Sequence, residues 1–177
     1  MHGVPMNRDG LEGELTRQHP GAFAWALRCC RGDREAAEDA LHAAYVRILE
    51  GRARFAGRSS FRTWLFGVVR RTALEERRRS WLRLTRLERW FGRAGASRQG
   101  DGGPIGSLVA SETADRLRVA LDRLSERQRA MMHLVFYEDL TVQEAAEVLG
   151  VPVGTARTHY ERGKARLRAL LAGTDLR

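Results

Sequence analysis

Cysteine, proline and lysine are scarce in this sequence of 177 residues. It contains two cysteines and four prolines, and only Lys164 among its 31 basic residues is a lysine. Cys29 and Cys30 are neighbours, too few and too close together for a disulfide framework. We interpret them as small, partly buried helix residues, with redox or metal sensing as the alternative.

Long apolar runs are also missing. No segment approaches the roughly 20 apolar residues that span a bilayer, and the first 20 residues hold no apolar signal-peptide core. The sequence also lacks metal-ligand clusters, a phosphate-binding loop and paired carboxylates in an apolar setting. It therefore predicts a cytoplasmic protein that is no enzyme, has no cofactor or metal, and does not insert into a membrane.

Positive charge, by contrast, is in excess and unevenly placed. The net charge is +9, and it is concentrated in residues 52–93, with 13 basic and 3 acidic side chains, and in residues 151–177, with 6 and 2. Two basic blocks indicate a partner with many phosphates that is contacted at two places. A basic membrane-binding helix is the rival interpretation, but neither block has a wide, strongly apolar opposite face.

Apolar residues recur at helical spacing along the chain, and sustained two-residue alternation does not occur. The stretch GRAGASRQGDGGPIG, residues 92–106, has six glycines and one proline, which is typical of a flexible linker. The sequence predicts an all-α fold with two small helical domains, at residues 12–91 and 108–172, joined by a flexible Gly-rich linker over 92–107. The first eleven residues are expected to form a loose tail.

The end of the chain has helix-turn-helix spacing. Thr141 and Glu144 have the form of a capping box that opens a short helix. Gly150 can adopt the left-handed conformation of a tight junction, and Pro152 suits the first turn of the next helix. The second helix of such a pair enters the major groove, although a solvated amphipathic helix is the alternative. The residues expected to bind DNA here are Thr155, Arg157, Thr158, Glu161, Arg162 and, at phosphates, Lys164.

Three stretches, in this order, resemble an extracytoplasmic-function sigma factor, a small two-domain promoter-specificity subunit of bacterial RNA polymerase. They are GDREAAEDALHAAYVRILEG, FAGRSSFRTWLFGVVRRTALEERRR and, after the linker, LSERQRAMMHLVFYEDLTVQEAAEVLGVPVGTARTHYERGKARLRALL. Each stretch alone is a weak signal, whereas their combination is specific. The resemblance implies a protein that directs core polymerase to promoters and initiates transcription. A stand-alone helix-turn-helix regulator is the alternative.

The resemblance also implies protein partners. A helix through residues 38–47 is expected to dock on the clamp helices of the largest polymerase subunit, and the second domain on the flap of the second subunit. The expected docking residues are Glu38, Asp39, His42 and Arg47. The family usually has a glutamine and an acid where this chain has His42 and Ala43. An anti-sigma factor is a further implied partner.

By the same resemblance, residues 55–79 bind and melt the minus-ten element of the promoter. Melting requires an aromatic surface that holds an unstacked base, with cations along the backbone. Trp64 is the candidate aromatic, with a place in the core as the alternative, and Arg71 stands where the family often has an asparagine. The residues expected at this element are Phe55, Ser59, Ser60, Phe61, Arg62, Trp64, Arg70, Arg71, Arg77 and Arg78.

Overall fold

The computed structural model describes the backbone of residues 8–91 and 112–172, and the side chains of 8–82 and 116–172. Every regular element in these ranges is a helix, which confirms the all-α prediction. The chain forms two compact units, residues 1–103 and 104–177. The predicted linker lies outside the described residues. Among the residues that are described, no helix is long and apolar enough to cross a membrane.

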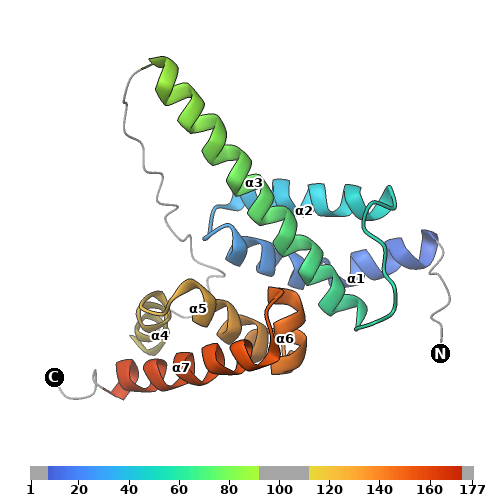
Figure 1. Ribbon diagram of the computed structural model, residues 1–177. Helices are drawn as coiled ribbons and strands as arrows, with labels where there is room; N and C mark the ends of the chain where they lie inside the picture. The colour runs from blue at the N-terminus through green and yellow to red at the C-terminus, as the bar shows by residue number, and fades with distance from the viewer. Residues whose placement is uncertain (1–7, 92–111, 173–177) are drawn as a thin grey trace. The chain divides into compact units, whose positions relative to one another are not determined.

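The first unit is a bundle of three helices that pack pairwise (Figure 1). They are α1 (Arg8–Cys29), α2 (Arg34–Leu49) and α3 (Phe61–Phe91). Asp33 caps α2, because its Oδ1 accepts the Ala36 N–H at 3.0 Å. The longest helix, α3, runs past the ends of α1 and α2.

The predicted N-terminal tail of eleven residues is too long, because α1 already begins at Arg8. Its first turn carries Asp9, a favourable charge at a helix N-terminus. Arg8 Nε also pairs with Glu12 Oε1 at 3.1 Å across one turn. These surface charges extend the helix although little is buried there.

Trp25 is the central residue of the first core. Its side chain is 1% exposed, its ring stacks on Phe66 with centroids 6.2 Å apart, and its Nε1 donates to the Phe66 carbonyl oxygen at 3.0 Å. A buried indole N–H requires such an acceptor. Fully buried alanines on α2 allow close helix packing, namely Ala37, Ala40 and Ala44. The core tryptophan is therefore Trp25, while Trp64 is only half-buried.

The second unit contains α4 (Glu112–Asp122), α5 (Glu126–Met132), the π-helix η1 (His133–Tyr137), α6 (Val142–Leu149) and α7 (Val153–Ala172). The predicted capping box of Thr141 and Glu144 is confirmed. Gly150 has the predicted left-handed conformation, with φ 63° and ψ 41°. Pro152 lies one residue before α7, and its carbonyl accepts the Ala156 N–H at 3.0 Å.

The π-helix is a feature that apolar spacing did not predict. The Glu138 N–H donates to the His133 carbonyl, five residues back, at 3.1 Å. This wider turn keeps Leu134 fully buried while Phe136 and Tyr137 are 61% and 62% exposed. The π-turn ends the helix, and α6 begins only at Val142, so no further turns follow whose shifted apolar phase could reveal it in the sequence.

Gly163 marks a close approach of α7 to α5. A Cβ at this position would lie 3.1 Å from Met132 Cε and 3.3 Å from Gln128 Cβ. We expect Gly163→Val to lower the free energy of unfolding by about 1–3 kcal/mol, because overpacking forces the helices apart. Urea unfolding followed by circular dichroism measures this. Gly154→Ala, where a Cβ meets open space, is the control and should cost nothing. A Gly163→Val protein as stable as the wild type would contradict the tight contact.

Candidate functional site

Three aromatic rings form a cluster where the loop before α3 meets the helix. The centroids of Phe55 and Phe61 are 5.4 Å apart, those of Phe55 and Trp64 5.4 Å, and those of Phe61 and Trp64 5.2 Å. All three side chains are half-buried. The structure thus brings together the aromatic residues that the sequence predicts for the minus-ten element. Each ring packs on the other two and keeps part of its surface in solvent.

The same loop is fixed to α3 by a helix cap. Ser60 Oγ accepts the Thr63 N–H at 3.1 Å and lies 2.8 Å from Thr63 Oγ1. Ser59 donates its hydroxyl to the Ser60 carbonyl at 3.4 Å. Gly57, with φ 67°, supplies the left-handed residue of the turn. Ser60 therefore has a structural role, and the cap and the aromatic cluster together hold the loop in place.

Three of the five arginines expected at the minus-ten element are partly buried rather than free in solvent. The guanidinium of Arg62 lies 5.4 Å from the centroid of the Phe66 ring. Arg77 Nη1 donates to the Cys29 carbonyl at the end of α1, at 3.4 Å. Arg70 is half-buried as well, and its charge acts on the Cys29 thiol. Arg77 and Arg70 thus lie next to the end of α1, whereas the printed contact of Arg62 is made within α3.

Arg71 and Arg78 face solvent instead. They are exposed, they lie two turns apart on one side of α3, and neither forms an ion pair within the described residues. Arg58 in the loop is equally exposed and was missed by the sequence prediction. Arg58 could have been predicted, because it follows Gly57 in a turn between the expected contacts Phe55 and Ser59. Arg58, Arg71 and Arg78 are the cations of this region that are available to a phosphate backbone.

Cys30 is buried in the bundle and Cys29 is partly buried. Burial, with the neighbouring thiol as a lesser cause, raises the pKa of Cys29 to about 12, and burial raises the pKa of Cys30 to about 11. Both thiols are therefore protonated at neutral pH, and a protonated thiol is a poor nucleophile and a poor metal ligand. This favours the interpretation as small helix residues over redox or metal sensing.

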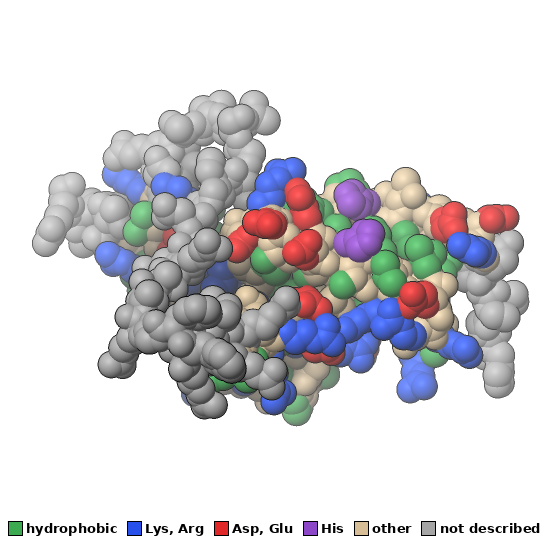
Figure 2. Space-filling view, turned by 90° about the horizontal axis from the view of Figure 1, so that it is seen from above, with side chains coloured by type: hydrophobic (Ala, Val, Ile, Leu, Met, Phe, Trp, Pro, Cys, Tyr) green, Lys and Arg blue, Asp and Glu red, His purple; other side chains and the backbone are tan. Residues whose placement is uncertain are grey.

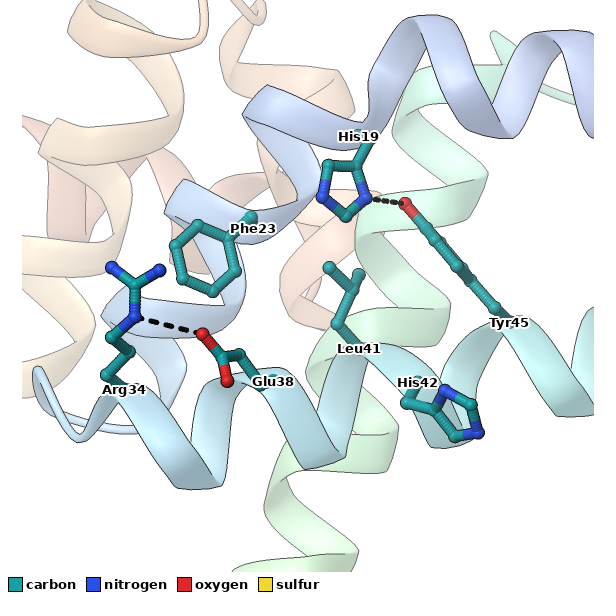
Figure 3. Close-up of a pocket in the computed structure, with 7 residues that line it drawn as sticks. All are labelled: His19, Phe23, Arg34, Glu38, Leu41, His42 and Tyr45. Carbon is teal, nitrogen blue, oxygen red and sulfur yellow. Dashed lines mark hydrogen bonds and ion pairs between the residues drawn. The ribbon is translucent and has the colours of Figure 1, made fainter.

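A groove of about 360 Å³ lies between α1 and α2 (Figure 3). Phe23 and Leu41 supply its apolar part. On one side the Arg34 guanidinium lies 5.3 Å from the centroid of the Phe23 ring and pairs with Glu38 at 2.9 Å. The other lining residues are His19, His42 and Tyr45, of which His19 Nδ1 and Tyr45 Oη are 3.2 Å apart. Figure 2 shows histidine and acidic side chains close together on one face of the molecule.

Three of the four predicted docking residues face solvent on α2. Glu38, Asp39 and His42 are exposed, and Glu38 and His42 line the groove. Arg47 does not belong to this face, contrary to the prediction. Its Nη2 lies 2.6 Å from Glu75 Oε2 on α3. Nine residues separate Arg47 from Glu38, which is two and a half helical turns, so the two side chains point to opposite sides of α2.

In the second unit, one face of α7 packs against α4, α5 and α6, and the opposite face is exposed to solvent. Ala156 and Gly163 are buried. The predicted DNA-binding residues that are exposed are Arg157, Thr158, Glu161 and Arg162. They lie on the first half of the helix, which is the half that a helix-turn-helix presents to the major groove.

The other predicted residues of α7 are partly engaged. Thr155 is half-buried, and Thr158 donates its hydroxyl to the Gly154 carbonyl at 2.9 Å. Lys164 Nζ lies 5.2 Å from the centroid of the Tyr160 ring and 3.9 Å from Glu161 Oε2. The two freely presented cations of the first half of α7 are thus its arginines.

Comparison with known proteins matches both units to one family. The family models "Sigma-70 region 2" and "Sigma-70, region 4" match residues 15–83 and 114–167. The chain is 30% identical over 137 residues to the ECF RNA polymerase sigma factor SigX of Bacillus subtilis, covering 77% of this chain and 71% of SigX. The chain belongs to the extracytoplasmic-function sigma factors. This assignment decides against a stand-alone helix-turn-helix regulator.

A second relative of the sigma factor is the ECF RNA polymerase sigma factor SigE of Mycolicibacterium smegmatis. The two are 29% identical over 160 residues, which is 90% of this chain but only 61% of the length of SigE. In fold, the chain is similar to the sigma factor RpoE of Bartonella quintana, solved in complex with the anti-sigma factor NepR. The TM-score is 0.66 at 23% identity, over 92% of this chain and 96% of that one.

Proposed function

We propose that this sigma factor binds core RNA polymerase in the cytoplasm, directs it to promoters that carry a minus-ten and a minus-thirty-five element, and assists in opening the DNA. It performs no catalysis of its own. The observation that carries the proposal is the presence, in one chain of this family, of two different surfaces that suit DNA. One is an aromatic loop flanked by free arginines, and the other is a recognition helix.

The aromatic loop is suited to single-stranded DNA. Major-groove readers leave the bases stacked and need no aromatic surface, whereas a melted strand is stabilised by stacking on aromatic side chains and by cations along its backbone. Phe55, Phe61 and Trp64 offer the rings, and Arg58 and Arg71 offer the cations. We assign this role to the first domain, whose helices span residues 8–91, with Ser59 and Ser60 shaping the loop.

The recognition helix is suited to duplex DNA. Arg157 and Arg162 are exposed on the half of α7 that enters a major groove, where an arginine binds guanine with two hydrogen bonds. We assign the minus-thirty-five element to the second domain, residues 108–172. The second domain is also our candidate for contact with the flap of the second polymerase subunit.

We assign core docking to the α1–α2 groove and the exposed face of α2 beside it. The groove combines an apolar floor with a polar rim, which is the composition of a protein interface. The same surface is a candidate for an anti-sigma factor, because an inhibitor that covers it would compete directly with the polymerase. Glu38, Asp39 and His42 are the proposed contacts.

The double variant Asp39→Arg with His42→Ala tests the docking surface. We expect co-purification with core polymerase to weaken by about tenfold or more, because a misplaced like charge at an interface costs several kcal/mol. Asp9→Arg is the matched control, since it reverses an exposed charge on α1 before residue 15, where the family match begins. Wild-type protein should give promoter-specific transcription with core polymerase. Unchanged co-purification of the double variant would remove the docking assignment.

A further inference from the structure

A glutamate lies among the arginines on the first half of α7, where neither guanine contacts nor phosphate contacts explain it. Glu161 is one turn beyond Arg157 and directly before Arg162, and its side chain is 61% exposed. Double-stranded DNA carries one negative charge about every 1.7 Å along its axis. A carboxylate brought against this charge weakens binding to every sequence, unless a particular base compensates for the repulsion.

Three side chains next to Glu161 form a connected series. Glu161 Oε2 lies 3.9 Å from Lys164 Nζ, and Lys164 Nζ lies 5.2 Å from the centroid of the Tyr160 ring. Tyr160 in turn stacks on Phe136, with ring centroids 6.0 Å apart and planes inclined by 27°. The ring attracts the ammonium and so fixes its place. The ion pair itself is long and exposed, and such a pair is weak, so the carboxylate is guided by Lys164 and is still available to DNA.

The π-helix supplies the first ring of this series. Its wide turn keeps Leu134 fully buried and leaves Phe136 61% exposed. The Phe136 ring is therefore outside the core, where it packs on Tyr160 of α7. The π-turn thus places an external ring against the middle of α7, beside the residues that we assign to base contacts.

The edges of the bases indicate which base suits a carboxylate. In the major groove guanine presents two acceptors, thymine an acceptor and a methyl group, and adenine an acceptor beside its amino donor. The edge of cytosine presents the N4 amino donor alone. An ionised carboxylate can only accept hydrogen bonds. It is therefore repelled by guanine and thymine, meets one acceptor on adenine, and suits the edge of cytosine.

We propose that Glu161 is a specificity residue that accepts a hydrogen bond from the N4 amino group of a cytosine in the upstream element, and that Lys164 is its positioning residue. The inference rests on the proposed function, because it requires α7 to enter a major groove. Arg157 and Glu161 are four residues apart, which is about 6 Å along the helix, or less than two base-pair steps of about 3.4 Å. The cytosine therefore lies within about two base pairs of the guanine bound by Arg157.

Selection from a randomised upstream element tests this role with reconstituted holoenzyme. The templates share a minus-ten sequence that supports transcription, and one turn of upstream duplex, about ten base pairs, is randomised. We expect the wild type to enrich cytosine at one position by about 5- to 10-fold, the low end for a base contact because one hydrogen bond is made. Glu161→Ala should lose this enrichment and keep the selected guanines. Glu161→Gln should shift the preference to adenine, because an amide both donates and accepts.

A cytosine analogue without the amino group isolates the hydrogen bond. Pyrimidin-2-one placed opposite guanine lacks N4, and its missing Watson–Crick hydrogen bond affects every protein variant alike. At the selected position it should weaken wild-type binding by the same factor of about 5 to 10 and leave Glu161→Ala binding unchanged. Lys164→Met should reduce the preference for cytosine. Lys164→Arg should restore it, since arginine can keep both the ion pair and the ring contact.

Glu147→Ala is the matched control. Glu147 is an exposed glutamate on α6, the first helix of the same helix-turn-helix, and that helix crosses the DNA backbone rather than entering the groove. Its replacement removes one negative charge, so affinity should rise for all sequences alike and the base preferences should stay the same. Thermal melting of each variant checks that the second unit remains folded.

The outcomes separate the role of Glu161 from the function on which it rests. A wild-type holoenzyme that selects no upstream sequence would count against the proposed function. Selected guanines without a cytosine, or a cytosine preference that survives in Glu161→Ala, would overturn the role of Glu161. If Glu161→Ala only raises affinity for every sequence, as Glu147→Ala does, the carboxylate acts by charge alone and the proposal is wrong. An unchanged cytosine preference in Lys164→Met would remove the positioning role of Lys164.

Discussion

Replacing Trp64 with alanine is expected to block promoter opening while leaving closed-complex binding through the second domain intact. Unstacking a base costs a few kcal/mol, and stacking on an aromatic side chain returns about 1–3 kcal/mol per base. Loss of this stacking energy lowers the equilibrium constant for promoter opening by about 5- to 150-fold. Permanganate reactivity of thymines near the start site measures the opening directly.

The aromatic cluster makes the choice of variant important. Because the Trp64 ring packs on Phe55 and Phe61, alanine removes both a stacking surface and a packing contact. Trp64→Leu is the matched variant, since it keeps apolar volume in the cluster and removes the aromatic face. If stacking is the function, leucine should be nearly as defective as alanine. Normal opening with leucine would mean that the ring only holds the loop.

A pre-melted template separates opening from every later step. Both Trp64 variants should regain transcription on DNA with an unpaired bubble over the minus-ten region, because the cost of unstacking has already been met. Failure on this template, with fold and core binding intact, would show that the loop acts elsewhere in initiation.

Ser60→Ala is less informative than sequence alone suggests. The Ser60 hydroxyl caps α3, and its loss costs about 1 kcal/mol of stability whatever the DNA does.

Features that depend on local chemistry could be predicted from the sequence. The capping box at Thr141 and the left-handed Gly150 follow from side-chain hydrogen bonds and backbone sterics within a few residues. The all-α class follows from apolar spacing in the same way. These terms act in the isolated segment, so no knowledge of tertiary packing is needed.

Features that depend on a neighbouring helix could not be predicted from the sequence. Arg47 is charged and suits a surface in the sequence, but Glu75 on α3 binds it in the structure. Trp25 and Trp64 are the same residue type on helices of similar pattern, and only the fold determines that Trp25 occupies the core. The partner of Arg47 could not be predicted, but its absence from the docking face could. Arg47 lies half a turn away from Glu38 around the axis of α2. The exposure of Arg58 could also have been predicted, because the residue follows Gly57 in a turn.

The sigma factor should lose discrimination at the minus-thirty-five element when Arg157 and Arg162 are replaced by alanine. Both side chains are exposed on the first half of α7. A bidentate contact of arginine with guanine contributes about 1–3 kcal/mol of discrimination against the wrong base. Each variant that removes such a contact should therefore lower the preference for a cognate over a scrambled element by about 5- to 150-fold.

Arg168→Ala is the matched control for this change. Arg168 is an exposed arginine of the same helix, but it lies eleven residues, or about 16 Å, beyond Arg157. A contact at that distance from the helix start meets phosphates, so its loss should weaken cognate and scrambled elements equally and reduce the salt slope. Competition binding with both elements at several salt concentrations distinguishes the two behaviours. If Arg157→Ala and Arg162→Ala behave like Arg168→Ala, with discrimination unchanged, then α7 grips the backbone and the bases are read by other residues.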